Sequence, residues 1–154
     1  MSNLNALMVA VEVASRKRDD ARRALQDTQA AQQAARDQLD QLEGYARETE
    51  GRWGTRPDTV RQPEVMYHHY QFMDRLAHAA SLQGNVVGDH AHRVEVARQA
   101  LLDAELRLAS LRKVLERRRL ELALQQLRRE QKQTDERAAL QYRNTLQSAA
   151  SQEH

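Results

Sequence analysis

The sequence contains no cysteine, so neither disulfide bonds nor thiolate chemistry is available to it. The absence of disulfides suits a reducing compartment such as the cytoplasm. Aromatic residues make up only 4% of the 154 residues, with one phenylalanine and one tryptophan, and the mean hydropathy is −0.85. Because so little large apolar surface is available, we do not expect a compact globular core.

Long apolar runs are also missing. The first twenty residues hold one short apolar run with no basic segment before it, which is not the pattern of a secretory signal peptide. No stretch reaches the roughly 18–20 apolar residues that a membrane-spanning helix needs. We therefore expect a soluble, cytoplasmic protein.

Proline and glycine, the two strongest helix breakers, are confined to one region. The two prolines and five glycines all lie within residues 44–88. Elsewhere Ala, Leu, Arg, Gln and Glu dominate, and all of these favour helix. The composition predicts helices over about 3–50 and 64–148, joined by a loop at about 51–63, with disorder as the competing interpretation.

A heptad repeat of apolar residues favours helix over disorder. In the first predicted helix the seam positions are mostly apolar and are occupied by Leu4, Leu7, Val11, Ala14, Arg18, Ala21, Leu25, Thr28, Gln32, Ala35, Leu39, Leu42, Ala46 and Thr49. In the second they are occupied by Val94, Ala97, Leu101, Ala104, Leu108, Leu111, Leu115 and Leu122. Such seams are typical of coiled coils. The prediction is an all-α single domain over residues 1–154, in which two long helices form an antiparallel coiled-coil hairpin and the second helix is the longer.

The position of the loop predicts which residues face each other. With a loop centre near residue 57, the numbers of facing residues add to about 114 in an antiparallel pair. The facing pairs are then Phe72 with Leu42, Leu76 with Gln38, and Tyr45 with His69. Residues from about 113 onward would have no partner within the hairpin.

The second predicted helix contains two interior glycines, Gly84 and Gly88. Each costs about 1 kcal/mol relative to alanine within a helix. Either the helix continues, with or without a kink at residues 82–89, or it breaks and the protein is a three-helix bundle, and we favour a continuous or locally bent helix.

The net charge of +2 hides a basic segment. Residues 107–137 carry 10 Lys or Arg and 5 Asp or Glu, a net charge of +5. Its arginines could neutralise nucleic-acid phosphates. However, Glu116, Glu121 and Glu130 are expected to pair with arginines three or four residues away, and no aromatic residue is present for base stacking. A solvated charged face and a protein-binding surface are favoured over nucleic-acid binding.

The stretch VMYHHYQFMDRL, residues 65–76, concentrates two of the four tyrosines, the only phenylalanine and two of the six histidines. No histidine pair has the spacing of a helical zinc site, and no catalytic motif is present, so we expect no metal, cofactor or enzymatic activity. A hydrophobic clasp that closes the hairpin is the simplest interpretation. Because one seam cannot bury all of Tyr67, Tyr70 and Phe72, part of this surface should stay exposed, as in protein-binding patches.

Residues 5–140 resemble the FliJ family of flagellar export proteins. The most specific matches are YHHYQFMDRL, which follows a loop of the right size, and LERRRLELALQQLRREQKQTDERAA, residues 115–139. The second helix of the family begins and ends with similar elements. The segment ASRKRDDARRAL, residues 14–25, fits the first helix of the family but is unspecific.

The resemblance implies a non-enzymatic stalk that binds the hexameric export ATPase FliI and the export gate protein FlhA, escorts export chaperones, and lies at the inner membrane only through the export apparatus. The implied ATPase-binding residues lie in the basic segment and are Arg117, Arg118, Arg119, Arg128, Arg129 and Lys132. The implied gate-binding residues are Gln38, Leu42, Tyr45, Phe72, Leu76 and Ala79. Thr49 and Gln83 depart from the family pattern at the rim of this surface. The alternative function is a generic coiled-coil adaptor or the stalk of a virulence secretion system.

Overall fold

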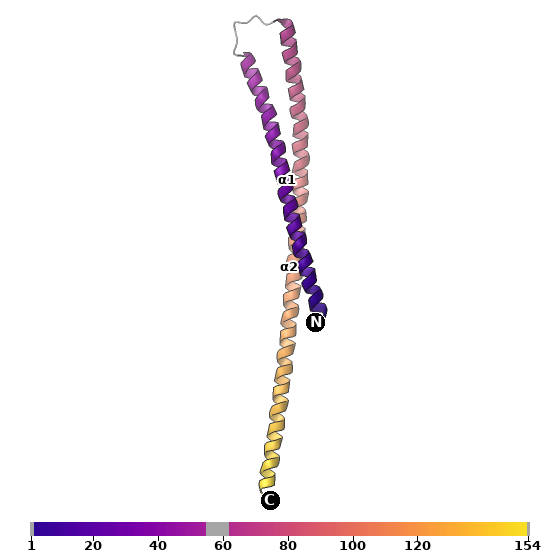
Figure 1. Cartoon of the computed structure of the whole chain (residues 1–154), viewed down its shortest axis with the longest axis vertical. Coiled ribbons are helices and arrows are strands. Elements are labelled where there is room, and N and C mark those ends of the chain that lie inside the picture. Colours follow the sequence, from indigo (N-terminus) through magenta and orange to yellow (C-terminus); the bar gives the residue numbers. More distant parts are fainter. Residues whose placement is uncertain (1, 55–61, 154) are drawn as a thin grey trace. The chain divides into compact units, whose positions relative to one another are not determined.

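The computed structural model describes residues 2–54 and 62–153 and consists of two helices. Helix α1 spans Ser2–Gly54, and helix α2 spans Pro63–Gln152 (Figure 1). The described residues contain no strand. The predicted all-α hairpin, with the second helix longer than the first, is confirmed.

Helix α1 extends through a glycine that the sequence analysis placed in the loop, whereas α2 is continuous through its two interior glycines. Helix α1 continues past Gly51 to Gly54, and α2 continues without interruption through Gly84 and Gly88. Helix α2 begins at Pro63, whose fixed φ and missing N–H are tolerated in a first helical turn. The carbonyl of Gln62, just before it, accepts hydrogen bonds from the N–H groups of residues 65 and 66 at 3.0 and 3.2 Å.

The side chains that α1 buries follow the predicted heptad. Each of the fourteen predicted seam positions in α1 is buried or half-buried, and the residues between them are mostly exposed. The same holds for the predicted seam of α2 from Val94 to Leu122. Small residues such as Ala14 and Ala35 are among the most buried, which is consistent with close helix approach.

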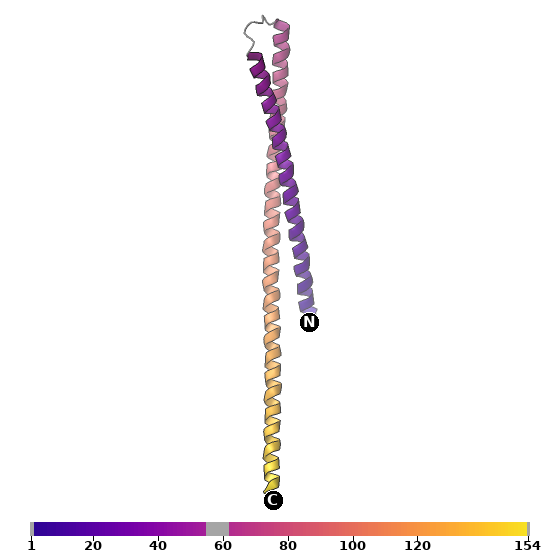
Figure 2. The same ribbon diagram turned by 60° about the vertical axis from the view of Figure 1, so that its left-hand side comes forward.

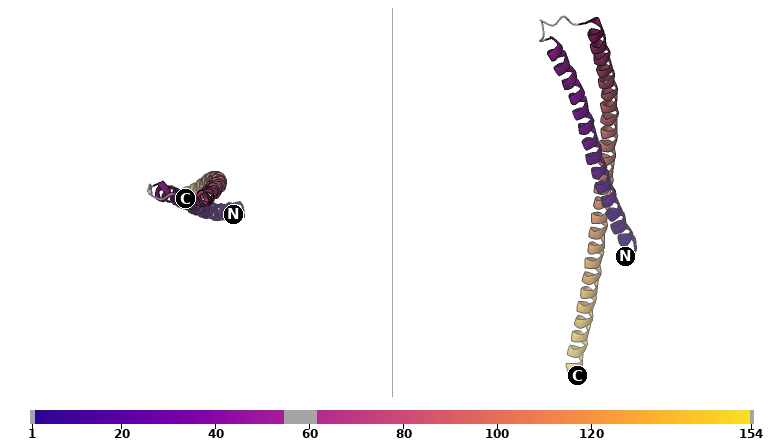
Figure 3. Two further views of the ribbon diagram at one scale, coloured as in Figure 1. Left: turned by 90° about the horizontal axis from the view of Figure 1, so that it is seen from above. Right: turned by 45° about the horizontal axis from the view of Figure 1, so that its top comes forward.

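The chain divides into two compact units, each of which combines a piece of α1 with a piece of α2. We call residues 15–106 the loop-end unit and residues 1–14 with 107–154 the terminal unit. In the loop-end unit the α1 and α2 segments run side by side in opposite directions, as Figures 2 and 3 show from several sides. That the whole chain forms a single domain stays a prediction.

Contacts in the loop-end unit show that the predicted register was wrong by several residues. The side chain of Gln83 reaches Ala35 and Gln38 on α1, and two ring pairs, Tyr45 with Phe72 and Trp53 with His69, also join the helices. In each of these pairs the two residue numbers add to between 117 and 122, whereas the predicted register gives about 114. The cause is the end of α1, because extension of the helix to Gly54 moves the midpoint of the connection toward the C-terminus.

In the terminal unit the buried residues reach further along α2 than predicted. Leu108 and Leu115 are only 2% and 8% exposed, and Leu122 is half-buried. Every described residue from 123 onward is exposed. The unpaired part of α2 therefore begins about ten residues later than the predicted start near residue 113, which is the direction that the register correction requires.

Candidate protein-binding surfaces

The aromatic residues of the loop-end unit gather where α1 ends and α2 begins. The ring of Trp53, near the end of α1, stacks on that of His69 with centroids 3.9 Å apart and planes 2° from parallel. Both residues are half-buried. The predicted clasp between the helices is therefore present, but His69 meets Trp53 and not Tyr45.

A second ring pair forms further from the connection. Tyr45 and Phe72 meet edge to face, with centroids 6.0 Å apart and planes at 85°, the arrangement that aromatic quadrupoles favour. The prediction that Phe72 faces Leu42 is wrong by about one helical turn, for the same reason as the register. Despite their contact, Tyr45 is 51% and Phe72 40% exposed, so the pair presents apolar surface to solvent.

The start of α2 carries further exposed aromatic side chains. Tyr67 and Tyr70 are well exposed, and the amide nitrogen of Gln71 donates a hydrogen bond of 2.9 Å to the hydroxyl of Tyr67. The sequence indicated that one seam could not bury every aromatic ring in this stretch, and the exposure of these tyrosines confirms it.

A shallow groove lies beside the Tyr45–Phe72 pair. Its lining residues come from both helices of the loop-end unit and are Gln38, Gln41, Leu42, Tyr45 and Gln83. The side-chain nitrogen of Gln83 donates to the main-chain oxygen of Ala35 at 2.9 Å and to Oε1 of Gln38 at 3.2 Å. These hydrogen bonds join the two helices that line the groove.

The groove brings together part of the predicted gate-binding set. It contains Gln38, Leu42 and Tyr45, and Phe72 joins it through Tyr45. Leu76 and Ala79 are half-buried. The predicted pairing of Leu76 with Gln38 is wrong, because Gln38 meets Gln83. Sequence reasoning treated Gln83 only as a departure at the rim. Its spacing from Val94 places it on the heptad of α2, but a single sequence does not show that it finds a partner across the helices.

The predicted ATPase-binding residues all lie on α2 in the terminal unit. Arg118 occupies a half-buried seam position and pairs with Glu121 at 3.2 Å, as predicted. The other members of the set are exposed and are Arg117, Arg119, Arg128, Arg129 and Lys132.

Two of the acids predicted to pair with these arginines do not do so. Glu116 forms no ion pair within the described chain, and the carboxylate of Glu130 accepts a hydrogen bond from Gln126 instead, so the predicted pairing of these two acids is wrong. This leaves more uncompensated positive charge than the sequence suggested.

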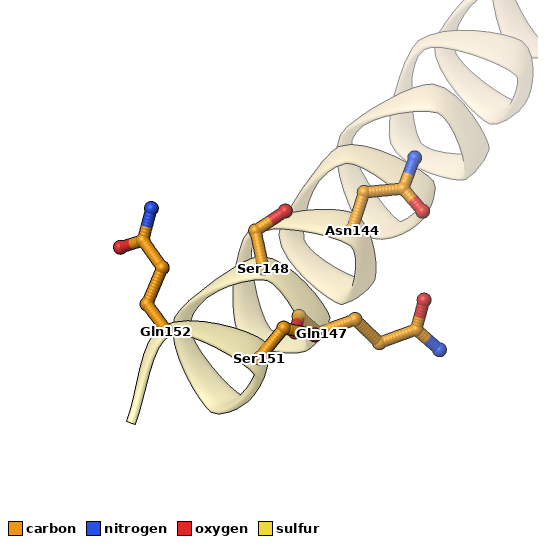
Figure 4. Close-up of a pocket in the computed structure, with 5 residues that line it drawn as sticks. All are labelled: Asn144, Gln147, Ser148, Ser151 and Gln152. Atoms are coloured by element: carbon orange, nitrogen blue, oxygen red, sulfur yellow. The ribbon is translucent and has the colours of Figure 1, made fainter. Parts of the chain in front are cut away.

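Further hollows among the described residues are shallow dips on α2 alone. Figure 4 shows Asn144, Gln147, Ser148, Ser151 and Gln152 near the end of α2, where polar side chains project outward without enclosing a space. Residues 2–54 and 62–153 hold no cluster of three or more His, Asp or Glu side chains arranged for a metal ion. Nor does any helix among them have the length and apolarity to cross a membrane.

These features define an all-α helical hairpin with an exposed aromatic groove in one unit and a basic helical segment in the other. The sequence pattern of one family, described as "Flagellar FliJ protein", matches residues 3–147 of the chain. The protein belongs to the FliJ family, whose members take part in flagellar protein export. No curated protein and no solved structure matches the chain.

Proposed function

We propose that this protein is a non-enzymatic stalk of the flagellar type III export apparatus, and that it binds the hexameric export ATPase FliI and the gate protein FlhA through different surfaces. The observation that carries this proposal is the separation of two kinds of exposed surface, one aromatic and one basic, into the two units of the chain. Through these contacts the protein is held at the inner membrane without entering it, and it also escorts export chaperones.

The basic segment is the proposed ATPase-binding surface. Residues 107–137 carry a net charge of +5, and five of the six predicted arginine and lysine residues are exposed. Since only Arg118 of this set is held in an ion pair, the remaining cations are free to meet carboxylates of a partner. Arginine is well suited to this role because its guanidinium group can bind a carboxylate with two hydrogen bonds.

The aromatic groove is the proposed gate-binding surface. Tyr45 and Phe72 offer exposed ring surface, and Gln38 and Gln41 offer amide groups at the edge of the same groove. An apolar centre with a polar rim is the usual composition of a protein–protein contact.

Binding measurements with purified partners test the ATPase assignment. We expect the double variant Arg128→Glu with Arg129→Glu to lose most binding to the ATPase and to keep binding to the cytoplasmic part of the gate protein. The matched control is Arg22→Glu with Arg23→Glu, which makes the same charge change at two exposed positions of the loop-end unit. Equal loss of ATPase binding in both variants would show nonspecific electrostatic attraction and would refute the assignment.

A further inference from the structure

A second apolar stripe runs along α2 in the terminal unit, and it does not belong to the seam. Leu120, Leu124 and Leu127 recur at four- and three-residue spacing and are 62%, 46% and 60% exposed. At 100° per residue they lie roughly 120–180° around the helix from the seam residues Leu115 and Leu122. The described residues of the chain thus leave this stripe uncovered.

The charges beside this stripe indicate what covers it. With Leu120 and Leu127 as heptad d positions and Leu124 as an a position, the flanking e and g positions are rich in charge. The e residues are Glu121, Arg128 and Asp135, and the g residues are Glu116, Ala123, Glu130 and Arg137. We propose that the stripe binds the same stripe of a second copy of the chain, with the two α2 helices antiparallel. The proposal does not depend on the ATPase or gate assignments.

One antiparallel register places Leu124 and Leu127 opposite each other and brings opposite charges together, while Leu120 faces Gln131 of the second copy. When Leu124 faces Leu127 of the second copy, the e positions place Glu121 beside Arg128, and the g positions place Glu116 beside Arg137. The two-fold symmetry of a homodimer repeats each of these pairs. Glu130 then meets Ala123, so no like charges face each other.

In the competing arrangements of the dimer, like charges face each other. A shift of one heptad in one direction places Glu121 beside Glu121, and a shift in the other places Arg128 beside Arg128. A parallel dimer in register places Glu116 beside Glu121 and Glu130 beside Asp135. Like charges at these positions are destabilising, so the charge pattern favours the one antiparallel register and disfavours its neighbours.

The shape of the helix surface is compatible with this pairing. Lys113, Glu116, Arg117 and Leu120 line a shallow hollow, and four residues at this spacing form the hole that receives a side chain from a facing helix. A similar hollow lies on another face of α2, lined by Glu136, Ala139, Leu140 and Arg143. The hollow alone therefore does not select the face, whereas the leucines and the flanking charges do.

Sedimentation velocity of the full chain between about 1 and 100 μM tests the stripe. We expect a monomer–dimer equilibrium, and Leu124→Asp should raise the dimer dissociation constant by about a hundredfold or more, because the charge is introduced twice into the apolar centre. Leu140→Asp, at an exposed position on the opposite face, is the control and should leave dimerisation unchanged. Circular dichroism checks that both variants stay helical. A wild-type chain that is monomeric throughout this range would refute the proposal.

Charge exchange tests the partner and the register together. Glu121→Arg and Arg128→Glu should each weaken the homodimer by about tenfold or more, while an equimolar mixture of the two variants should form a heterodimer in which the opposite charges meet again. If each variant alone dimerises as strongly as the mixture of the two, the proposed register is wrong.

Orientation is measured with a spin label at Ala139→Cys, the sole cysteine of that variant. In the proposed register residue 139 lies beside residue 112 of the second copy, so the two labels are separated by about 40 Å at 1.5 Å per residue. A parallel dimer would place the labels within about 20 Å, since helices in contact are 8–10 Å apart. The short distance would refute the antiparallel arrangement.

Discussion

The ring of Trp53 lies flat on the ring of His69, with 3.9 Å between centroids and 2° between planes. The first residue comes from the end of α1, and the second from the second turn of α2. Because the two rings join the helices across their connection, this contact fixes the pairing at the loop end of the hairpin. It also places the only tryptophan of the chain at a site whose environment changes when that end opens.

We predict that His69→Ala lowers the free energy of unfolding of the hairpin by about 0.5–1.5 kcal/mol, the range for a well-placed ring pair. Tryptophan fluorescence should respond in the folded protein, because the indole loses its stacking partner. The measurement is urea unfolding followed by both fluorescence and circular dichroism. His78→Ala, which alters an exposed histidine further along α2, should change neither signal. Equal effects of the two substitutions would contradict a specific role of the stack.

Gln83 provides the polar link between the helices, and its removal should be costly. Gln83→Ala loses the hydrogen bonds to Ala35 and Gln38, and we expect a loss of about 1–2 kcal/mol. Gln38→Ala removes only one of these bonds and should cost less. In a double-mutant cycle the two substitutions should couple, because they share a hydrogen bond. Gln99→Ala, whose partner Asp103 lies on the same helix, is the control.

The sequence predicted which face of each helix is buried but not how the two faces are aligned. The heptad identified every seam position of α1, because apolar spacing fixes the buried face of a helix. The alignment depended on where α1 ends. Gly51 and Gly54 suggested a loop, yet the helix runs through Gly51 and ends at Gly54, and this difference displaced the predicted partners of Phe72 and His69.

For the aromatic groove, too, the sequence predicted which residues are exposed but not which of them contact each other. Tyr45 and Phe72 were expected in one exposed surface, and they lie together. The predicted register placed Phe72 opposite Leu42 and Tyr45 opposite His69. It therefore did not predict the direct contact between the two rings. Gln83 was missed as a bridge because a single sequence does not show which polar seam residue finds a partner across the helices.

The two interior glycines of α2 offer a test of whether flexibility is needed there. Apart from the adjacent residues and the backbone of its own helical turn, an added Cβ at Gly84 or Gly88 would meet no atom within 4 Å, and neither residue has a positive φ. We therefore expect Gly84→Ala and Gly88→Ala each to raise the free energy of unfolding by about 0.5–1 kcal/mol, measured by chemical denaturation. Ser81→Ala, an exposed position nearby, is the control and should have a smaller effect. Destabilisation by either glycine substitution would show that α2 must bend at this point.

The proposed gate contact predicts a selective loss of binding. Tyr45→Ala with Phe72→Ala removes the exposed ring pair, and we expect affinity for the gate protein to fall by about tenfold or more, since aromatic anchors often contribute at least 1.4 kcal/mol. Binding to the ATPase should be retained. The control is Tyr142→Ala with Leu146→Ala, which removes two exposed apolar side chains from the terminal unit. Isothermal titration calorimetry with each partner separates the outcomes, and equal loss of both partners with helicity preserved would contradict separate surfaces.

Removal of residues 123–154 should leave the stability of the hairpin almost unchanged. Every described residue in this range is exposed, so its deletion takes little packed surface from the fold. A chain that ends at Leu122 should unfold within about 0.5 kcal/mol of the full chain in urea, the range for surface changes away from buried contacts. A chain that ends at residue 106 is the contrast, because it also loses the buried Leu108 and Leu115, and the removal of each buried leucine is expected to cost about 2–5 kcal/mol. All three chains are compared at a protein concentration well below the dimer dissociation constant, so that self-association does not stabilise the full chain. Strong destabilisation by the shorter deletion would mean that the end of α2 contributes packing that its exposure does not suggest.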